Sequence, residues 1–130
     1  MMKNVPTREE IEAIRNSILL PFMLDMLEAE LRKLQHDRQP LRNLFVEANE
    51  SLSRDIFNEL VTVRKYLKEH DIKVVEGDRV GEEMHYKFWC RGYEDEFMLM
   101  RFLAKSELSI RFGRYIGEMG TRWKKERLTR

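Results

Sequence analysis

The amino-acid sequence predicts an α+β protein with two long antiparallel N-terminal helices, a small antiparallel β-meander and a C-terminal helix. Three observations support this prediction. Apolar residues recur every three or four positions over residues 7–71, tend to alternate over residues 72–102 around glycine-marked breaks, and return to helical spacing over residues 103–130. Spacing of three or four places side chains on one stripe of a helix, whereas alternation places them on opposite faces of a strand.

The first helix is expected to begin after Thr7, which forms a capping-box pattern with Glu10. Pro21 lacks the N–H that the helix ladder needs, so the sequence predicts a kink or a break there. A stripe of leucines continues from Leu20, and the helix is expected to end by residues 36–39. The four residues that we call the leucine seam are Leu24, Leu27, Leu31 and Leu34.

The second helix is expected to start near Pro40, which suits the first turn of a helix. One face of the segment then stays apolar over residues 41–67. A break near residues 49–53 is an alternative, because two serines there could cap a fresh start. Since no glycine or proline occurs at that point, we favour one long helix that ends by Asp71. It would pair antiparallel with the first helix across a short loop.

The central part of the sheet has the clearest strand signal. The predicted strands cover about residues 72–76, 83–91 and 95–102. Residues 77–81 have loop chemistry and should connect the first two strands. Within residues 83–91 the side chains alternate, which predicts that Tyr86 and Phe88 are buried and that Trp89 lies on the opposite face.

The segment 95–102 has two interpretations. It could be a third strand, or it could form the first turns of the last helix, with the acidic residues 94–96 at the positive end of the helix dipole. We favour the strand, because an isolated two-stranded hairpin is only marginally stable, whereas a three-stranded sheet can be stable. The last helix then runs from about Leu103 to Gly117, and the basic tail beyond it is expected to fray.

Length and composition indicate one domain over residues 1–130. The chain is 42% hydrophobic and 36% charged, which allows a core of ordinary size. Cys90 is the only cysteine, so no intrachain disulfide can form, and this favours the cytoplasm. The longest apolar run, residues 18–24, is far shorter than the roughly 20 residues of a membrane helix. We therefore expect no membrane association.

The side chains that could perform catalysis or hold a metal form no recognisable constellation. The three histidines, His36, His70 and His85, and Cys90 make no C-x-x-C or H-x-x-x-H pair. His36 and His70 each fall at a predicted helix C-terminus, where an imidazole is a favourable cap. We therefore expect a non-enzymatic protein without catalytic residues, cofactor or metal.

Two groups of residues could bind nucleic acid. Lys87, Trp89 and Arg91 share one predicted face of the central strand, where an indole flanked by cations could stack on bases or anchor a protein partner. The tail repeats this mixture of cations and an indole in Arg122, Trp123, Lys124, Lys125 and Arg127. Nucleic-acid binding is the alternative function that these residues suggest.

The favoured function is a small cytosolic protein-protein interaction or regulatory module that forms a homodimer. The apolar stripes exceed what two helices and a small sheet need, so part of this surface is expected to lie in a subunit contact. The candidate interface residues are the leucine seam and Trp89.

Overall fold

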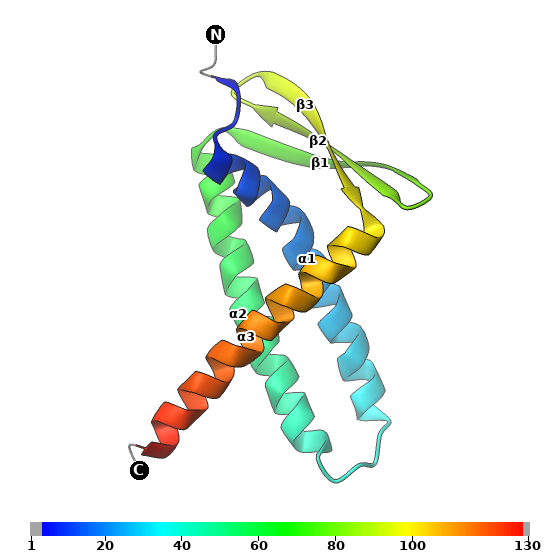
Figure 1. Cartoon of the computed structure of the whole chain (residues 1–130), viewed down its shortest axis with the longest axis vertical. Helices are drawn as coiled ribbons and strands as arrows, with labels where there is room; N and C mark the ends of the chain where they lie inside the picture. The colour runs from blue at the N-terminus through cyan, green and yellow to red at the C-terminus, as the bar shows by residue number, and fades with distance from the viewer. Residues whose placement is uncertain (1–3, 129–130) are drawn as a thin grey trace.

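The computed structural model describes residues 4–128, apart from the side chains of residues 123 and 126–128. Two helices form an antiparallel hairpin, a three-stranded antiparallel sheet lies at one end of it, and the last helix crosses the hairpin diagonally (Figure 1). The predicted α+β class and the order of its parts are confirmed. The elements are α1 (Arg8–Gln35), α2 (Arg42–Glu69), β1 (Ile72–Val80), β2 (Glu83–Cys90), β3 (Tyr93–Met100) and α3 (Arg101–Leu128).

Helix α1 begins at the predicted capping box and does not break at the proline. The Thr7 hydroxyl accepts a hydrogen bond from the Glu10 amide at 3.2 Å, and the Glu10 carboxylate accepts one from the Thr7 amide at 2.8 Å. Of the predicted kink or break, the break is wrong, since α1 continues through Pro21, and the kink stays a prediction. Leu20 and Met23 on either side of the proline are fully buried. Their packing outweighs the roughly 3 kcal/mol that a proline costs inside a helix.

Helix α2 is one uninterrupted helix, as favoured, and begins two residues after Pro40. Two side chains of α2 tie it to backbone carbonyls of α1. The amide Nδ2 of Asn49, a buried side chain, donates to the carbonyl of Leu27 at 2.8 Å, and Nε of Arg42 donates to the carbonyl of Leu34 at 2.8 Å. These bonds fix the register of the hairpin, because each joins one particular turn of α1 to one turn of α2.

Strand β1 is longer than predicted, because residues 77–80 are strand rather than loop. The pairing of β1 with β2 shifts between Glu76 and Arg79, which marks a β-bulge. Gly77 lies in this bulge, and a Cβ there would lie 3.0 Å from the carbonyl oxygen of His85. The glycine therefore lets the two strands approach closely and continue, which the loop interpretation of the Gly77–Gly81 segment overlooked.

Strand β2 is the central strand of the meander, with order β1-β2-β3. Its inner face is buried as predicted, and the residues on that face are Met84, Tyr86, Phe88 and Cys90. The favoured third strand is also confirmed, although β3 ends at Met100 and α3 begins two residues earlier than expected. The Arg101 amide donates to the carbonyl of Glu82 at 2.8 Å, which holds the start of α3 against the β1–β2 turn.

Helix α3 does not end near Gly117 but continues to Leu128, and the fraying of the tail stays a prediction. Tyr115 and Met119 are buried against the rest of the core. The Tyr115 hydroxyl donates to Glu59 of α2, and Nη2 of Arg122 lies 2.7 Å from a carboxylate oxygen of Asp55. These contacts with α2 support the helix beyond its glycines.

Candidate protein-interaction face

The leucine seam lies within the helical hairpin rather than on an open surface. Leu27 is buried in the core, and Leu24, Leu31 and Leu34 are half-buried. The bonds from Asn49 and Arg42 reach the carbonyls of Leu27 and Leu34, so α2 covers this side of α1. Most of the apolar area of the seam is thus used inside the chain.

The outer face of the sheet carries charges of both signs around Trp89. In the first cross-strand row Trp89 lies between Lys73 on β1 and Glu94 on β3. In the second row Lys87 lies between Val75 and Glu96. Opposite residues of antiparallel strands share a face, so Lys87 lies beside Glu96, while Lys73 and Glu94 lie on either side of Trp89. These two rows carry no net positive charge, and Trp89 itself is half-buried.

Arg91 does not join Lys87 and Trp89 on that face. It forms, with Gly92, the two-residue turn between β2 and β3, where φ is 52° at Arg91 and 88° at Gly92. Positive φ at both positions is typical of a type I′ hairpin turn. The guanidinium instead bonds the carboxylate of Glu10, which is buried, with Nη1–Oε2 at 2.7 Å, and donates to the carbonyl of His70 at 3.0 Å.

The basic tail is part of α3 and is remote from the sheet. Figure 1 shows the sheet at one end of the molecule and the end of α3 at the other. Arg122 is paired with Asp55, and Lys124 and Lys125 are exposed. The side chains of Trp123 and Arg127 lie outside the described part of the structure. Trp89 and the tail therefore do not form one continuous basic face.

The histidine caps are confirmed in the structure. His36 is the C-cap of α1 and His70 the C-cap of α2. Nδ1 of His70 lies 2.8 Å from the carbonyl oxygen of Tyr66, and the two rings stack with centroids 3.9 Å apart. The His70 side chain thus contacts the last turn of α2, whereas His36 caps α1 through its backbone N–H.

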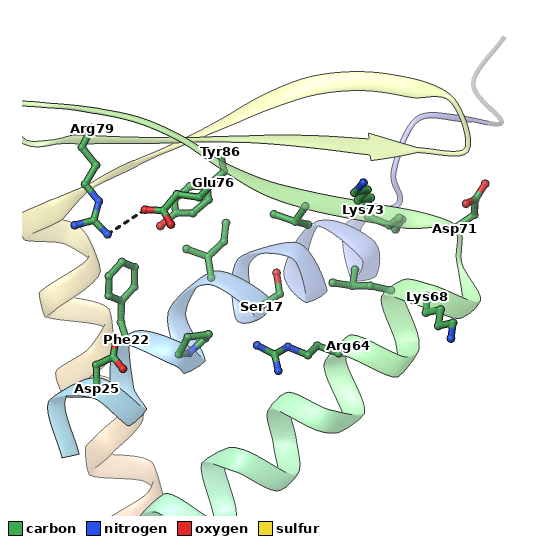
Figure 2. A pocket seen from close by; sticks show the side chains of 15 residues that line it. Ser17, Phe22, Asp25, Arg64, Lys68, Asp71, Lys73, Glu76, Arg79 and Tyr86 are labelled. Atoms are coloured by element: carbon green, nitrogen blue, oxygen red, sulfur yellow. Dashed lines mark hydrogen bonds and ion pairs between the residues drawn. The ribbon is translucent and has the colours of Figure 1, made fainter. Parts of the chain in front are cut away.

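A groove of about 610 Å³ lies between α1, the end of α2 and β1 (Figure 2). Arg64 reaches into it from α2 towards Ser17 on α1, and Arg79 on β1 bonds Glu76 at 3.1 Å. The charged residues that line the groove are of both signs: Arg64, Lys68, Lys73 and Arg79 against Asp25, Asp71 and Glu76. This mixture defines no single class of ligand.

The outward face of α3 is the most unusual surface of the described structure. We define the α3 face as an exposed strip of α3, which the exposed charged residues Lys105, Arg114 and Glu118 flank, and its residues are Phe102, Leu103, Ser106, Ser109, Ile110, Gly113, Ile116, Gly117, Gly120 and Thr121. None of these residues is charged, although the solvent side of a surface helix is normally polar and charged. Ile110 is 67% exposed and Ile116 is 55% exposed. An apolar strip of this length is typical of an interaction surface.

The two halves of the α3 face differ in shape. The first half carries the bulky side chains Phe102, Leu103 and Ile110, which are all exposed. The second half carries three glycines, and nothing lies within 4 Å of the position that a Cβ would take on Gly113, Gly117 or Gly120. The first half therefore presents knobs, and the second half presents a shallow hollow at its glycines beside one further exposed side chain, Ile116.

Sequence reasoning missed this face because it interpreted the glycines as a weak helix end. A signal was present, however. Leu103, Ser106, Ile110, Gly113 and Gly117 step three and four residues along the chain, and no charge interrupts the stripe. Ala104, Leu108 and Tyr115 form a second stripe on the opposite side, and that stripe is the one buried against the hairpin.

The fold and its surfaces define a small α+β protein with a helical hairpin, a three-stranded meander and a bracing C-terminal helix. The chain matches the family model described as YhjD protein over residues 5–120, and it belongs to this family. No curated protein and no solved structure matches the chain. Among the described helices, none combines the length and the apolar character required to cross a membrane.

Proposed function

We propose that the protein is a small, non-enzymatic interaction module of the cytoplasm that forms a homodimer through the α3 face. The observation that supports this most strongly is the uncharged, exposed strip over residues 102–121. Cys90, which is buried and unpaired, is consistent with a reducing compartment. The placement of Lys87, Trp89 and the tail gives the nucleic-acid alternative no comparable support.

A second copy of the chain suits the α3 face because the two halves of the face complement each other. In an antiparallel pair related by a two-fold axis, the knobs of one helix meet the hollow of the other. One register places Leu103 opposite Gly120 of the second copy, Ser106 opposite its Gly117 and Ile110 opposite its Gly113. Each pair sets a larger side chain against a glycine, which lets the helix backbones approach closely.

The charge pattern of the α3 face also favours self-association. Two copies of an uncharged face bury no unpaired charge, whose desolvation would oppose binding. The strip runs from residue 102 to residue 121 and is therefore roughly 28 Å long at ~1.5 Å per residue. Contact through one helix is at the small end of specific interfaces. We therefore expect a dimer of micromolar affinity rather than an obligate one.

Sedimentation velocity over a concentration series tests the dimer. The unmodified chain should be dimeric at tens of micromolar and should dissociate on dilution. Ile110→Asp should weaken the dimer by at least about tenfold, because it places a charge in the centre of the contact. Val61→Asp is the matched control, since Val61 is an exposed apolar residue of α2 outside the α3 face. A wild-type chain that stays monomeric at these concentrations would disprove the proposal.

Disulfide cross-linking tests the antiparallel register. Cys90 is buried, so an introduced surface cysteine is the accessible thiol. A mixture of Leu103→Cys and Gly120→Cys chains should form mixed disulfide dimers under mild oxidation. Leu103→Cys by itself should cross-link poorly, because two such residues would lie roughly 26 Å apart in the antiparallel pair. Efficient cross-linking of Leu103→Cys with itself would contradict the antiparallel arrangement.

A further inference from the structure

A second, smaller cavity lies where α1, the β1–β2 turn and the first turns of α3 meet. We call it the turn pocket, and its volume is about 230 Å³. Its apolar lining residues come from three elements, with Phe22 and Met26 on α1, Met84 on β2, and Leu108 on α3. Met84 and Leu108 are buried, whereas Met26 is 44% exposed. An apolar lining with a few charged groups is a common arrangement in small-ligand sites, and the volume of this pocket is below their usual range of roughly 300–1,000 Å³, which limits it to a small ligand.

The charged side chains that line the turn pocket are all cationic within the described structure: Arg79, Arg101 and Lys105. Arg79 forms an ion pair with the carboxylate of Glu76 at 3.1 Å, and its guanidinium carbon lies 5.9 Å from the centre of the Phe22 ring. Arg101 and Lys105 lie in the first turns of α3, where the dipole is also positive. No acidic residue occurs in the first turn of α3 to compensate these charges.

An anion at the mouth of the turn pocket would relieve this accumulation of positive charge, and an apolar tail would fill the cavity behind it. We propose that the turn pocket binds a medium-chain fatty carboxylate. At ~30 Å³ per non-hydrogen atom, the share of one water in the liquid, the cavity has room for roughly eight atoms, so octanoate matches it when its carbon chain fills the cavity and its carboxylate oxygens stay at the mouth. Its carboxylate would lie near Arg101 and Lys105, and its alkyl chain would contact Met26, Met84 and Leu108.

Titration of the full-length chain with a series of carboxylates tests the proposal, with methyl NMR of labelled methionines as the readout. Octanoate should shift the Met26 and Met84 methyl signals and leave that of Met98, on the outer sheet face, unchanged. Affinity should rise by up to about fourfold per methylene from butanoate to octanoate and then level off. Octanol should bind at least tenfold more weakly than octanoate, because it lacks the charge. Equal affinity for octanol and octanoate, or for acetate and octanoate, would overturn the proposal.

Two variants separate a specific site from general attraction to the protein. Arg101→Glu with Lys105→Glu should lower octanoate affinity at least tenfold and leave octanol binding unchanged. Met26→Asp should abolish the binding of both ligands, while Met98→Asp, at 47% exposure a close match for Met26, should abolish neither. The absence of any Met26 shift up to millimolar octanoate would reject the site. Tighter binding of a hydrophobic peptide with a free carboxyl end would assign the pocket to a protein segment instead.

Discussion

The guanidinium of Arg91 holds the carboxylate of Glu10 through two bonds, Nη1–Oε2 at 2.7 Å and Nη2–Oε1 at 3.0 Å, across 81 positions of the chain. Glu10 belongs to the first turn of α1, and Arg91 forms the β2–β3 turn. Arg91 also donates to the carbonyl of His70 at the end of α2. One side chain therefore joins the start of the hairpin, its return helix and the sheet.

The Glu10–Arg91 pair should make stability depend on pH in the acid range. Hydrogen bonding from Arg91 lowers the pKa of Glu10 from 4.5 to about 2, although burial opposes the shift. Because the folded-state pKa is the lower one, the stabilisation is complete well above the unfolded-state pKa of 4.5 and is lost progressively as the pH falls through 4.5 towards 2. Urea unfolding of wild type and Glu10→Gln should show a difference of about 3 kcal/mol that is constant above pH 5 and shrinks below it. Glu30→Gln, which alters an exposed ion pair, should show no such change.

Removing the arginine should be more damaging than removing a neighbouring surface cation. Arg91→Met leaves the Glu10 carboxylate buried without its partner, and such a loss costs about 3–5 kcal/mol. Lys87→Met on the exposed outer face of the sheet should change stability by less than about 0.5 kcal/mol. Chemical denaturation at pH 7 measures both variants. Equal effects of the two substitutions would show that Arg91 does not anchor Glu10.

Gly113→Ala should affect the monomer and the dimer in opposite directions. Alanine in place of a helical glycine stabilises a helix by about 0.5–1 kcal/mol, and the space above Gly113 is open. In the proposed dimer the new methyl group would meet Ile110 of the second copy and weaken association. Thermal unfolding at low concentration and sedimentation at high concentration separate the two effects. Strengthening of both would contradict the packing of knobs into the hollow.

Pro21→Ala should stabilise the protein by roughly 1–3 kcal/mol, because α1 continues through the proline and the new N–H can complete the helix ladder. Pro40→Ala, in the turn before α2, is the control and should have little effect. Equilibrium unfolding in urea distinguishes the two variants. A destabilised Pro21→Ala chain would indicate that the pyrrolidine ring itself packs favourably beside the groove.

Local patterns predicted the fold well where one physical rule acted without competition. The alternation over residues 83–91 identified β2 and the burial of Tyr86 and Phe88, because a half-buried strand requires that pattern. The Thr7 and Glu10 pair marked the start of α1 for the same reason, since both of its hydrogen bonds are local. These features depend on residues that are close in the chain.

The errors occurred where tertiary packing competes with local preference. Pro21 and Gly117 both favour an end to a helix, yet buried neighbours and contacts with α2 keep α1 and α3 continuous. Continuing the alternation of β2 to Arg91 places this residue on the same face as Trp89. The chain turns at Arg91, however, and its side chain bonds Glu10 instead. Its partner is remote in sequence, so no local pattern could identify the pair.

The candidate interface was expected on the leucine seam because that stripe is the most obvious in the sequence. A clear apolar stripe only shows that one side of a helix is buried. The stripe of the leucine seam is covered by α2 of the same chain. The apolar pattern of the α3 face is harder to recognise in the sequence, since glycines and serines separate its large residues. Its significance depends on knowing which side of α3 the hairpin already covers, and the three-dimensional arrangement provides that information.

Because Cys90 is buried, the rate at which a reagent labels its thiol can report the opening of the native protein. Its thiol is fully buried on the central strand, and burial is the main reason that its pKa is raised, so it is poorly reactive while the sheet stays closed. Because it is the only cysteine of the chain, a thiol reagent can label one site, and it can do so only when the sheet separates from the helices. The labelling rate therefore reports how often the native protein opens, residue-specifically and without denaturant.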